Sequence, residues 1–235
     1  LFIGNKGVRR TNNVNEIEHY EFGASLASDC MLRTMNLLDE GVCETALGES
    51  LNALGQKNSV VTIAAAGKRF VKANIYPTEN KVKTGDTISL TIGYKGGLSS
   101  RVGYAAQDAS QLPEGARDYV DAVVKPYYGA VVEWLEQVHC GMTGGQLYQR
   151  IDEVLPKAEY HWSLCPGHLT ADEEWMSSPV YAGSEEVLES GMLFQIDIIP
   201  SVKGYAGTSA ESTVALADEA LRQEIQKHAP ELWKR

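Results

Sequence analysis

The sequence predicts a single α+β domain built from two similar halves, and two repeated patterns support this prediction. A long helical period, a glycine and a shorter helical period occur around Gly41 and again around Gly141. A strand that opens on a glycine occurs at Gly85 and again at Gly191. The glycines of these two pairs are 100 and 106 residues apart, so the register holds along the chain. Such duplication predicts a fold that closes around a pseudo-two-fold axis.

The first half is expected to contain two helices and four strands. Apolar residues recur at three- and four-residue steps over residues 16–40, which predicts a long helix ended by Gly41. A shorter amphipathic helix is expected over residues 44–54. Val- and Ile-rich residues 59–66 predict a strand, with residues 70–75 as its partner. Residues 86–94 and 97–105 predict a strand pair joined by a Gly-rich turn.

The second half repeats this order after Pro113. A long helix is expected over residues 115–138 and a short one over residues 145–155, with Gly141 between them. Strands are expected at residues 159–164, 192–200 and 211–216, and a closing helix at residues 218–229. Thr91 and Asp197 each stand six residues after their strand-opening glycine. The duplication therefore predicts that these two side chains face each other at the centre of the molecule.

Composition and charge narrow the function. The 235 residues carry a formal charge of −10 and no cluster of Lys and Arg, which argues against binding to nucleic acid or to an anionic membrane surface. No apolar run approaches the roughly 20 residues of a bilayer span. The four cysteines are widely spaced, which is typical of reduced thiols in a cytoplasmic protein. Residues 1–13 are interpreted as the tail of a linker from a missing N-terminal region, and residues 14–235 as the domain.

Three ionisable side chains of the second half are the candidate catalytic residues. His168 follows Pro and Gly, Asp197 lies inside an apolar strand, and Glu211 opens the strand at residues 211–216. An unpaired carboxylate is costly in an apolar strand, so Asp197 needs a functional or structural partner. A histidine with two carboxylates in this setting is typical of an acid–base or metal site.

From residue 15 to residue 221 the chain resembles the pita-bread hydrolases, a family that includes methionine aminopeptidase, aminopeptidase P, prolidase and creatinase. The resemblance rests on residues 83–93 (KTGDTISLTIG), 166–168 (PGH), 191–197 (GMLFQID) and 210–214 (AESTV). It implies the duplicated pita-bread fold, a curved antiparallel sheet covered by helices. It also implies hydrolysis of a C–N bond in an amide or a peptide, in the manner of the Xaa-Pro peptidases or creatinase.

The metallopeptidases of this family bind two divalent metals through Asp, Asp, His, Glu and Glu. The resemblance places His168, Asp197 and Glu211 at the last three of these positions, with Asp197 in place of the usual Glu. Thr91 falls at the first aspartate, and Ser100 at the second, although Ser99 is an alternative. The first half thus supplies neither carboxylate.

The two missing carboxylates weaken the case for a dinuclear centre. Two divalent ions about 4 Å apart repel by roughly 17 kcal/mol at an effective dielectric of about 20, and hydroxyl groups supply no charge to offset this. We therefore expect no dinuclear site and no required cofactor. A single Mn or Zn ion at His168, Asp197 and Glu211 stays open, because three protein ligands suffice for a catalytic mononuclear site.

Other departures affect the expected mechanism. A family histidine ahead of the first strand pair corresponds to Asn74, and another falls near Trp175 or Met176. The acid–base histidine of creatinase, which works without metal, maps to Asn74, and an amide cannot transfer a proton. Since such transfer contributes about 10²–10⁴ in rate, His161 is considered as a substitute. Asn74, Thr91, Ser100 and His161 are expected to line the substrate pocket.

Three hypotheses follow from these residues. The first is a metal-independent or mononuclear hydrolase in which Glu211 and Asp197 orient the substrate nitrogen or a water, and His168 polarises the carbonyl. The second is a non-catalytic pseudo-peptidase that binds a small molecule or a peptide end. The third is an ordinary dinuclear peptidase with ligands elsewhere, such as Asp86 or Asp108. In each case we expect a small-molecule or short-peptide ligand, and the resemblance implies a homodimer.

Overall fold

The computed structural model describes residues 4, 6–53 and 55–234, and the described part of its first half forms three helices and three strands. The elements of this half are α1 (Val14–Leu37), α2 (Glu44–Leu51), β1 (Ile63–Ala66), α3 (Gly67–Val71), β2 (Thr87–Tyr94) and β3 (Gly97–Tyr104). Helix α1 begins at a capping box, in which the Asn13 side chain accepts from the backbone of Glu16 and the Glu16 carboxylate accepts from the Asn13 N–H.

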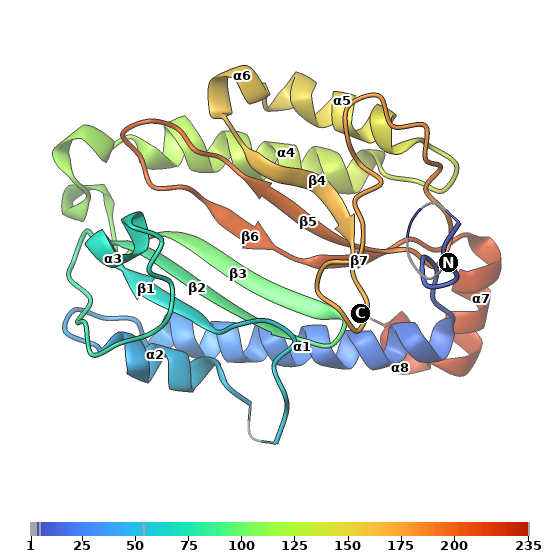
Figure 1. Cartoon of the computed structure of the whole chain (residues 1–235), viewed down its shortest axis with the longest axis horizontal. Helices are drawn as coiled ribbons and strands as arrows, with labels where there is room; N and C mark the ends of the chain where they lie inside the picture. Colours follow the sequence, from blue (N-terminus) through green and yellow to red (C-terminus); the bar gives the residue numbers. More distant parts are fainter. Residues whose placement is uncertain (1–3, 5, 54, 235) are drawn as a thin grey trace.

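The second half repeats the order of helices and strands. Two 3₁₀ turns (Ala109–Gln111 and Glu114–Ala116) and a π-helical segment (Val120–Val124) lead into α4 (Lys125–Gln137). The remaining elements are α5 (Gly144–Val154), α6 (Lys157–Tyr160), β4 (Ser163–Leu169), β5 (Leu193–Ile199), β6 (Ser209–Glu211), β7 (Thr213–Ala215), α7 (Glu219–His228) and α8 (Pro230–Trp233). Figure 1 shows α1 and α2 on one side of the strands and α4 and α5 on the other.

The strands form two antiparallel sheets that are joined by the last strands of the chain. One sheet has the order β1-β2-β3-β6 and the other β4-β5-β7. Because β6 pairs with β3 and the next strand, β7, pairs with β5, residues 209–215 connect the sheet of the first half to that of the second. This crossing brings residues of both halves to the centre of the molecule.

Matching hydrogen bonds confirm the duplication predicted from the glycines. The N–H of Gly41 donates to the Val82 carbonyl, and the N–H of Gly141 donates to that of Leu188, both at 2.8 Å. Gly85 and Gly191 donate in the same way to the carbonyls at residues 105 and 216. All four glycines have φ between 82° and 95°, a conformation that side chains with a Cβ seldom adopt. The predicted duplicated α+β fold is therefore confirmed.

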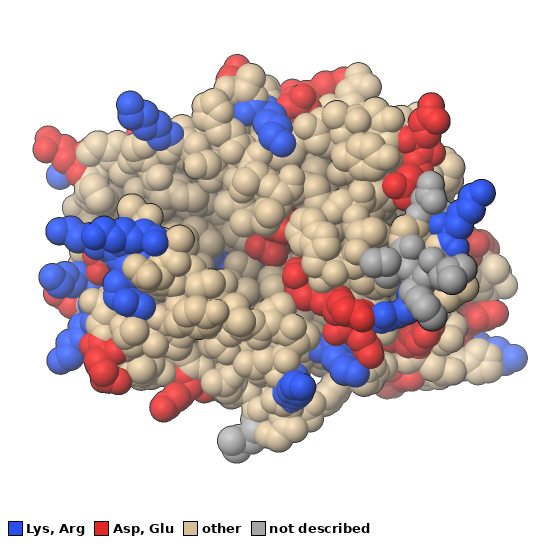
Figure 2. All heavy atoms as spheres, viewed as in Figure 1, with Lys and Arg blue, Asp and Glu red and all other residues tan. Residues whose placement is uncertain are grey.

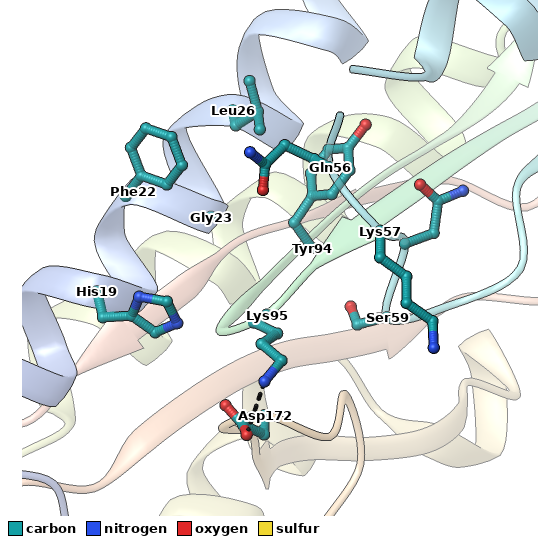
Figure 3. Close-up of a pocket in the computed structure, with 11 residues that line it drawn as sticks. His19, Phe22, Gly23, Leu26, Gln56, Lys57, Ser59, Tyr94, Lys95 and Asp172 are labelled. Carbon is teal, nitrogen blue, oxygen red and sulfur yellow. Dashed lines mark hydrogen bonds and ion pairs between the residues drawn. The ribbon is translucent and has the colours of Figure 1, made fainter. Parts of the chain in front are cut away.

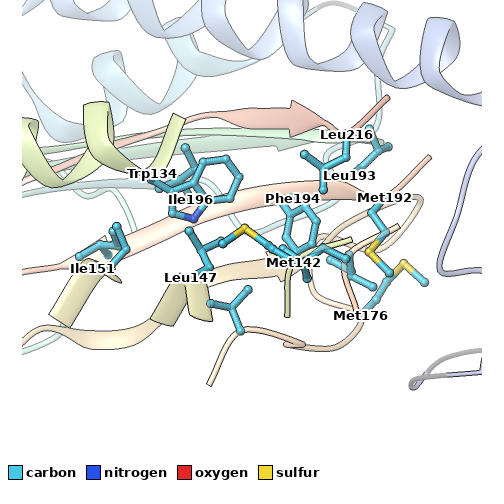
Figure 4. Close-up of a cluster of buried hydrophobic side chains, with 14 of the residues drawn as sticks. Trp134, Met142, Leu147, Ile151, Met176, Met192, Leu193, Phe194, Ile196 and Leu216 are labelled. Carbon is cyan, nitrogen blue, oxygen red and sulfur yellow. The ribbon is translucent and has the colours of Figure 1, made fainter. Parts of the chain in front are cut away.

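The hydrophobic core consists of one large cluster in the second half and a smaller one in the first. Figure 4 shows the larger cluster, in which Trp134 of α4 lies among Ile151, Leu147 and Phe194. Trp134 is fully buried, and its ring N–H donates to the carbonyl of Pro166 on β4. Since Pro166 is two residues before His168, the core fixes the backbone that carries this histidine.

Three secondary-structure predictions need correction. Residues 70–75 do not form a strand: residues 70 and 71 end α3, and Ala73 has a φ of 57°. Residues 159–164 divide between α6 and β4, because the chain turns at His161 with a φ of 47°. The long helix at 115–138 is interrupted, since Pro126 lacks an N–H and Lys125 instead donates to Val120 across a π turn.

Within residues 4, 6–53 and 55–234, no helix combines the length and the apolar character that a membrane span needs.

Candidate active site

The side chains of Thr91 and Ser100 bond to each other across the first sheet. Residue 91 on β2 is directly opposite residue 100 on β3, and residue 100 is in turn opposite Glu211 on β6. The two hydroxyl oxygens are 2.9 Å apart and both side chains are buried. The register therefore places the two hydroxyls and Glu211 side by side on adjacent strands.

His168 and Asp197 come from neighbouring strands of the second sheet. Residue 165 pairs with residue 197 and residue 168 with residue 195, so two residues of β4, 166 and 167, lie opposite one of β5, residue 196. This irregularity is a β-bulge, which re-aims side chains along the bulged strand. His168 is fully buried, and its Nε2 atom is 3.8 Å from an Asp197 carboxylate oxygen. Among the described residues, neither His168 Nε2 nor Asp197 Oδ1 has a hydrogen-bond partner.

Glu211 is held by hydrogen bonds at the end of β6. The Ser209 hydroxyl donates to one of its carboxylate oxygens at 3.0 Å, and the Gln195 amide donates to the other at 3.4 Å. The Arg101 guanidinium donates to the backbone carbonyls of Ser100 and Glu211 rather than to a carboxylate. These contacts fix the orientation of Glu211 without neutralising it by a direct ion pair.

A cavity of about 620 Å³ opens between the two sheets and collects most of these side chains. Its polar lining includes Thr91, Ser100, Asp197 and Glu211, and its walls are largely aliphatic and aromatic. Figure 2 shows the corresponding face of the molecule hollowed near its centre, with acidic atoms beside the hollow and most Lys and Arg side chains toward the edges. The described residues that line the cavity are Val60, Val61, Ile63, Phe70, Ser89, Thr91, Leu98, Ser100, Val102, Ser163, Leu164, Glu174, Trp175, Asp197, Ile199, Pro200, Ser201, Gly207 and Glu211.

Sequence reasoning missed one acidic residue of this cavity, Glu174. Its carboxylate is 3.3 Å from His168 Nε2. The next residue, Trp175, stacks on the His168 ring with 3.8 Å between ring centroids. The available signal was an acidic run followed by an aromatic residue, six to seven positions after His168. Glu174, Asp197 and Glu211 thus line the cavity, and the first two lie within 4 Å of His168, which is fully buried and is not among the lining residues.

Burial raises the pKa values of the two buried carboxyl groups. For Asp197 the pKa rises from 3.8 to about 8, because burial disfavours the charged form and the charges of Glu211 and Glu174 add repulsion. Burial also raises the pKa of Glu211, against the hydrogen bonds from Ser209 and Gln195, which lower it. Without a bound ligand, the carboxyl group of Asp197 is therefore protonated at neutral pH.

Two of the predicted pocket residues lie outside this cavity. Asn74 is exposed after α3, and its place at the wall is taken by Phe70 because residues 67–71 form a helix. His161 is also exposed, since it ends α6 in a left-handed conformation before β4 begins. Neither residue is within the group formed by Thr91, Ser100, His168, Asp197 and Glu211.

The alternative acidic residues have structural roles. Asp86 accepts a hydrogen bond from the backbone N–H of Lys83, and Asp108 accepts from that of Ser110 in a 3₁₀ turn. Neither carboxylate lines the central cavity. Within residues 4, 6–53 and 55–234, no three His, Cys, Asp or Glu side chains form a metal-binding group, and a single ion at His168, Asp197 and Glu211 stays a prediction.

A second cavity, of about 420 Å³, lies beside α1 and the β2–β3 turn. Figure 3 shows Phe22 and Leu26 of α1 on one side of it and the ion pair of Lys95 with Asp172 on another. None of the predicted catalytic residues lines this cavity. The two cavities share no described lining residue, but Asp172 belongs to the segment that carries Glu174 and Trp175, and Ser59 directly precedes Val60 of the central cavity.

The duplicated α+β fold, with its polar residues at a central cavity between the halves, defines the pita-bread class of protein. The sequence matches the profile of Metallopeptidase family M24 over residues 18–218, and the chain belongs to that family. No curated protein matches the chain.

Solved structures of the same fold are prolidases and related peptidases. An Xaa-Pro dipeptidase from Bacillus anthracis superposes with a TM-score of 0.74 at 18% identity, covering 90% of this chain and 61% of that one. A prolidase from Pyrococcus furiosus gives 0.72 at 21% identity, with 90% and 64% covered. An X-Pro aminopeptidase from Thermotoga maritima gives 0.72 at 19%, with 90% and 61% covered. The chain thus spans less than two thirds of these relatives.

Proposed function

We propose that the central cavity hydrolyses a C–N bond of an amide or a short peptide without a dinuclear metal centre. The observation that supports this proposal is the position of His168 Nε2, which is within 4 Å of the carboxylates of Glu174 and Asp197, both of which line the cavity. A buried acid–base group with unsatisfied atoms beside a ligand-sized cavity is typical of an active site.

In this mechanism the residues of the second half act on the substrate directly. Glu211 and Asp197 orient the scissile nitrogen or the attacking water, Glu211 accepts the proton that the water releases, and His168 polarises the carbonyl group. A protonated Asp197 is a hydrogen-bond donor near neutral pH, so it supplies the proton that the leaving nitrogen needs. The Thr91 and Ser100 hydroxyls complete the polar wall.

A dinuclear metal centre fits these residues poorly. The hydroxyls at the first-half positions bond to each other at 2.9 Å and carry no charge to balance two ions. A single Mn or Zn ion held by His168, Asp197 and Glu211 would act as a Lewis acid on the carbonyl, although the described side chains form no ready-made group of three ligands. Metal analysis of the purified protein separates the cases: two equivalents per chain would contradict the proposal, and one would assign the mononuclear form.

Turnover tests the hydrolase proposal itself. The metal-stripped protein is assayed against a panel of dipeptides, including Xaa-Pro peptides, and small amides, with and without added Mn²⁺ or Zn²⁺. We expect Glu211→Gln to lower turnover of every responsive substrate by about 10² or more, because the amide cannot act as a base. The exposed acid Asp121, 72% exposed and paired with Lys125, supplies the control variant Asp121→Asn. Full activity in Glu211→Gln would refute the mechanism.

A non-catalytic binding domain is the second candidate. It is favoured by the Trp175 ring, which covers a face of His168, and by the Thr91–Ser100 pair, which satisfies both hydroxyls internally. Robust hydrolysis of any member of the panel would exclude it. Under either candidate we propose a small-molecule or short-peptide ligand, a cytoplasmic location and a homodimer, the last to be checked by sedimentation.

A further inference from the structure

The cavity of about 420 Å³ beside α1, which the proposed function does not use, has the size of a small-ligand site. Its described lining residues come from α1, from the loop at residues 56–59, from the end of β2 with the following turn, and from Asp172. These residues are separate from those of the central cavity. A molecule bound beside α1 would therefore be a second ligand, distinct from the substrate of the central site.

The α1 side of this cavity is apolar and partly open to solvent. Phe22 is 60% exposed and Leu26 is half-buried one helical turn further on, so both side chains lie on the same face of α1 (Figure 3). Tyr94 is buried beside them, and its hydroxyl donates to the Leu51 carbonyl and accepts from the Ala53 N–H, which fixes the ring. An apolar ligand body that covers this wall removes exposed apolar surface from water, which favours binding.

A close contact between α1 and the turn after β2 sets one wall of the cavity. A Cβ atom on Gly23 would lie 2.1 Å from the backbone oxygen of Lys95, so only glycine permits this approach. Glycine is unfavourable inside a helix, and this contact explains its place in the middle of α1. The wall between α1 and the turn is therefore formed by backbone packing and not by exposed side chains alone.

The loop before β1 brings a lysine without a carboxylate partner to the cavity, across from α1 (Figure 3). Lys95 forms an ion pair with Asp172 at 3.0 Å, so these two charges offset each other. Within the described part of the chain, no ion pair joins Lys57 to a carboxylate. The lining thus has one lysine charge in excess, in a chain whose formal charge is −10, and this local excess favours an anion.

We propose that this cavity binds a small organic carboxylate with an aromatic or branched aliphatic body. The body packs on Phe22, Leu26 and Tyr94, and the Lys57 ammonium group donates to the carboxylate. Because Asp172 repels an anion placed close to Lys95, the carboxylate is assigned to Lys57. This inference goes beyond the proposed function, since it concerns a different cavity and a different ligand.

Calorimetric titration of the metal-stripped protein with two probes of similar shape tests the proposal. The probe 3-phenylpropanoate carries both the charge and the aromatic body, and 3-phenylpropanol carries the body alone. At neutral pH and low salt we expect the carboxylate to bind about fivefold or more tightly than the alcohol, because only the carboxylate forms an ion pair with Lys57. Equal affinities would overturn the proposal, as would the absence of binding by the carboxylate.

Two matched pairs of variants locate the bound probe. Lys57→Gln should abolish the preference for the carboxylate and leave the affinity for the alcohol unchanged. Lys227→Gln, which changes an exposed lysine of α7 outside the cavity, should alter neither affinity. Phe22→Ala should weaken both probes by about fivefold, because it removes apolar contact with the ring, whereas Phe70→Ala, the same change in the wall of the central cavity, should weaken neither. Circular dichroism checks that each variant is folded.

The pattern across the four variants decides the outcome. Weaker binding in Phe70→Ala together with unchanged binding in Phe22→Ala would assign the probe to the central cavity and overturn the proposal. Equal effects of Lys57→Gln and Lys227→Gln would also overturn it, because the preference would then reflect the net charge of the protein. Turnover is not measured in these titrations, so the proposed hydrolysis and this second site can each fail independently of the other.

Discussion

The buried carboxyl group of Asp197 predicts an unusual dependence of stability on pH. Its pKa is raised from 3.8 to about 8 by burial and by the charges of Glu211 and Glu174. Between these two pH values the folded protein holds a proton that the unfolded chain has released, so the unfolded state binds fewer protons. The free energy of unfolding therefore falls as the pH rises, and the whole contribution is lost above about pH 8.

The magnitude follows from the size of the shift. A shift of one pKa unit corresponds to about 1.4 kcal/mol, so about four units give an upper bound of about 6 kcal/mol between acidic and alkaline pH. Asp197→Asn replaces the acid by a neutral group of the same shape and removes this loss. Glu211 stays buried in the variant and its pKa stays raised, so the variant should not recover the full upper bound. We expect Asp197→Asn to raise the free energy of unfolding by about 2 kcal/mol or more at pH 9.

Urea denaturation of metal-stripped protein at about pH 5, 7 and 9 measures the effect. The native protein should lose stability across this range, while Asp197→Asn should lose much less. Asp121→Asn serves as the control, because this carboxylate is 72% exposed and its substitution should leave the pH dependence unchanged. Parallel curves for the native protein and Asp197→Asn would refute the assignment of the high pKa to this residue.

Three further substitutions separate structural from functional residues. Glu44 is fully buried; burial alone raises the pKa of its carboxyl group, but hydrogen bonds to the carboxylate, including one from the Ala66 N–H, outweigh this and lower the pKa. Glu44→Gln should therefore lower the free energy of unfolding by about 3 kcal/mol at neutral pH, measured by urea denaturation. The loss should be smaller at acidic pH, where the native carboxylate is protonated. Trp134→Ala should cost about 3–5 kcal/mol in the same assay, because it empties the centre of the larger core. Arg9→Ala removes an ion pair with Glu173, whose two side chains are 35% and 54% exposed. The free energy of unfolding should therefore fall by less than about 1 kcal/mol. Amide hydrogen exchange in residues 171–176 should nevertheless become faster, because the pair holds this segment locally. A slow-exchanging 171–176 segment in Arg9→Ala would contradict the last expectation.

The parts of the fold that the sequence predicts are those with strong local signals. Gly41, Gly85, Gly141 and Gly191 require positive φ, and their spacing alone defined the two halves. The strand at residues 70–75 was predicted from apolar residues. Phe70 does face the cavity, but it does so from a short helix. Short apolar runs carry no period, so their type depends on tertiary contacts.

In the candidate site, too, the sequence predicted the residues with strong local signals and missed those that depend on tertiary contacts. His168, Asp197 and Glu211 were found because an ionisable residue in an apolar strand is conspicuous. Glu174 was not found, and Trp175 was noted only as a position near which a family histidine falls. Residues 172–175 lie outside any strand, and three acidic residues in a run usually form a solvated surface. Only the return of this segment over β4, where Leu169 and Ser177 form an isolated bridge, turns one of the three acids toward His168.

The segment of residues 172–175 also makes the wall of the central cavity sensitive to the salt concentration of the surrounding solution. Its outward acids are held by exposed ion pairs, Glu173 with Arg9 and Asp172 with Lys95, while Glu174 and Trp175 face inward. Exposed pairs weaken as the ionic strength rises, because the Debye length shortens from about 10 Å at 0.1 M to about 3 Å at 1 M. Salt therefore loosens two residues of the cavity wall through contacts that lie outside the cavity.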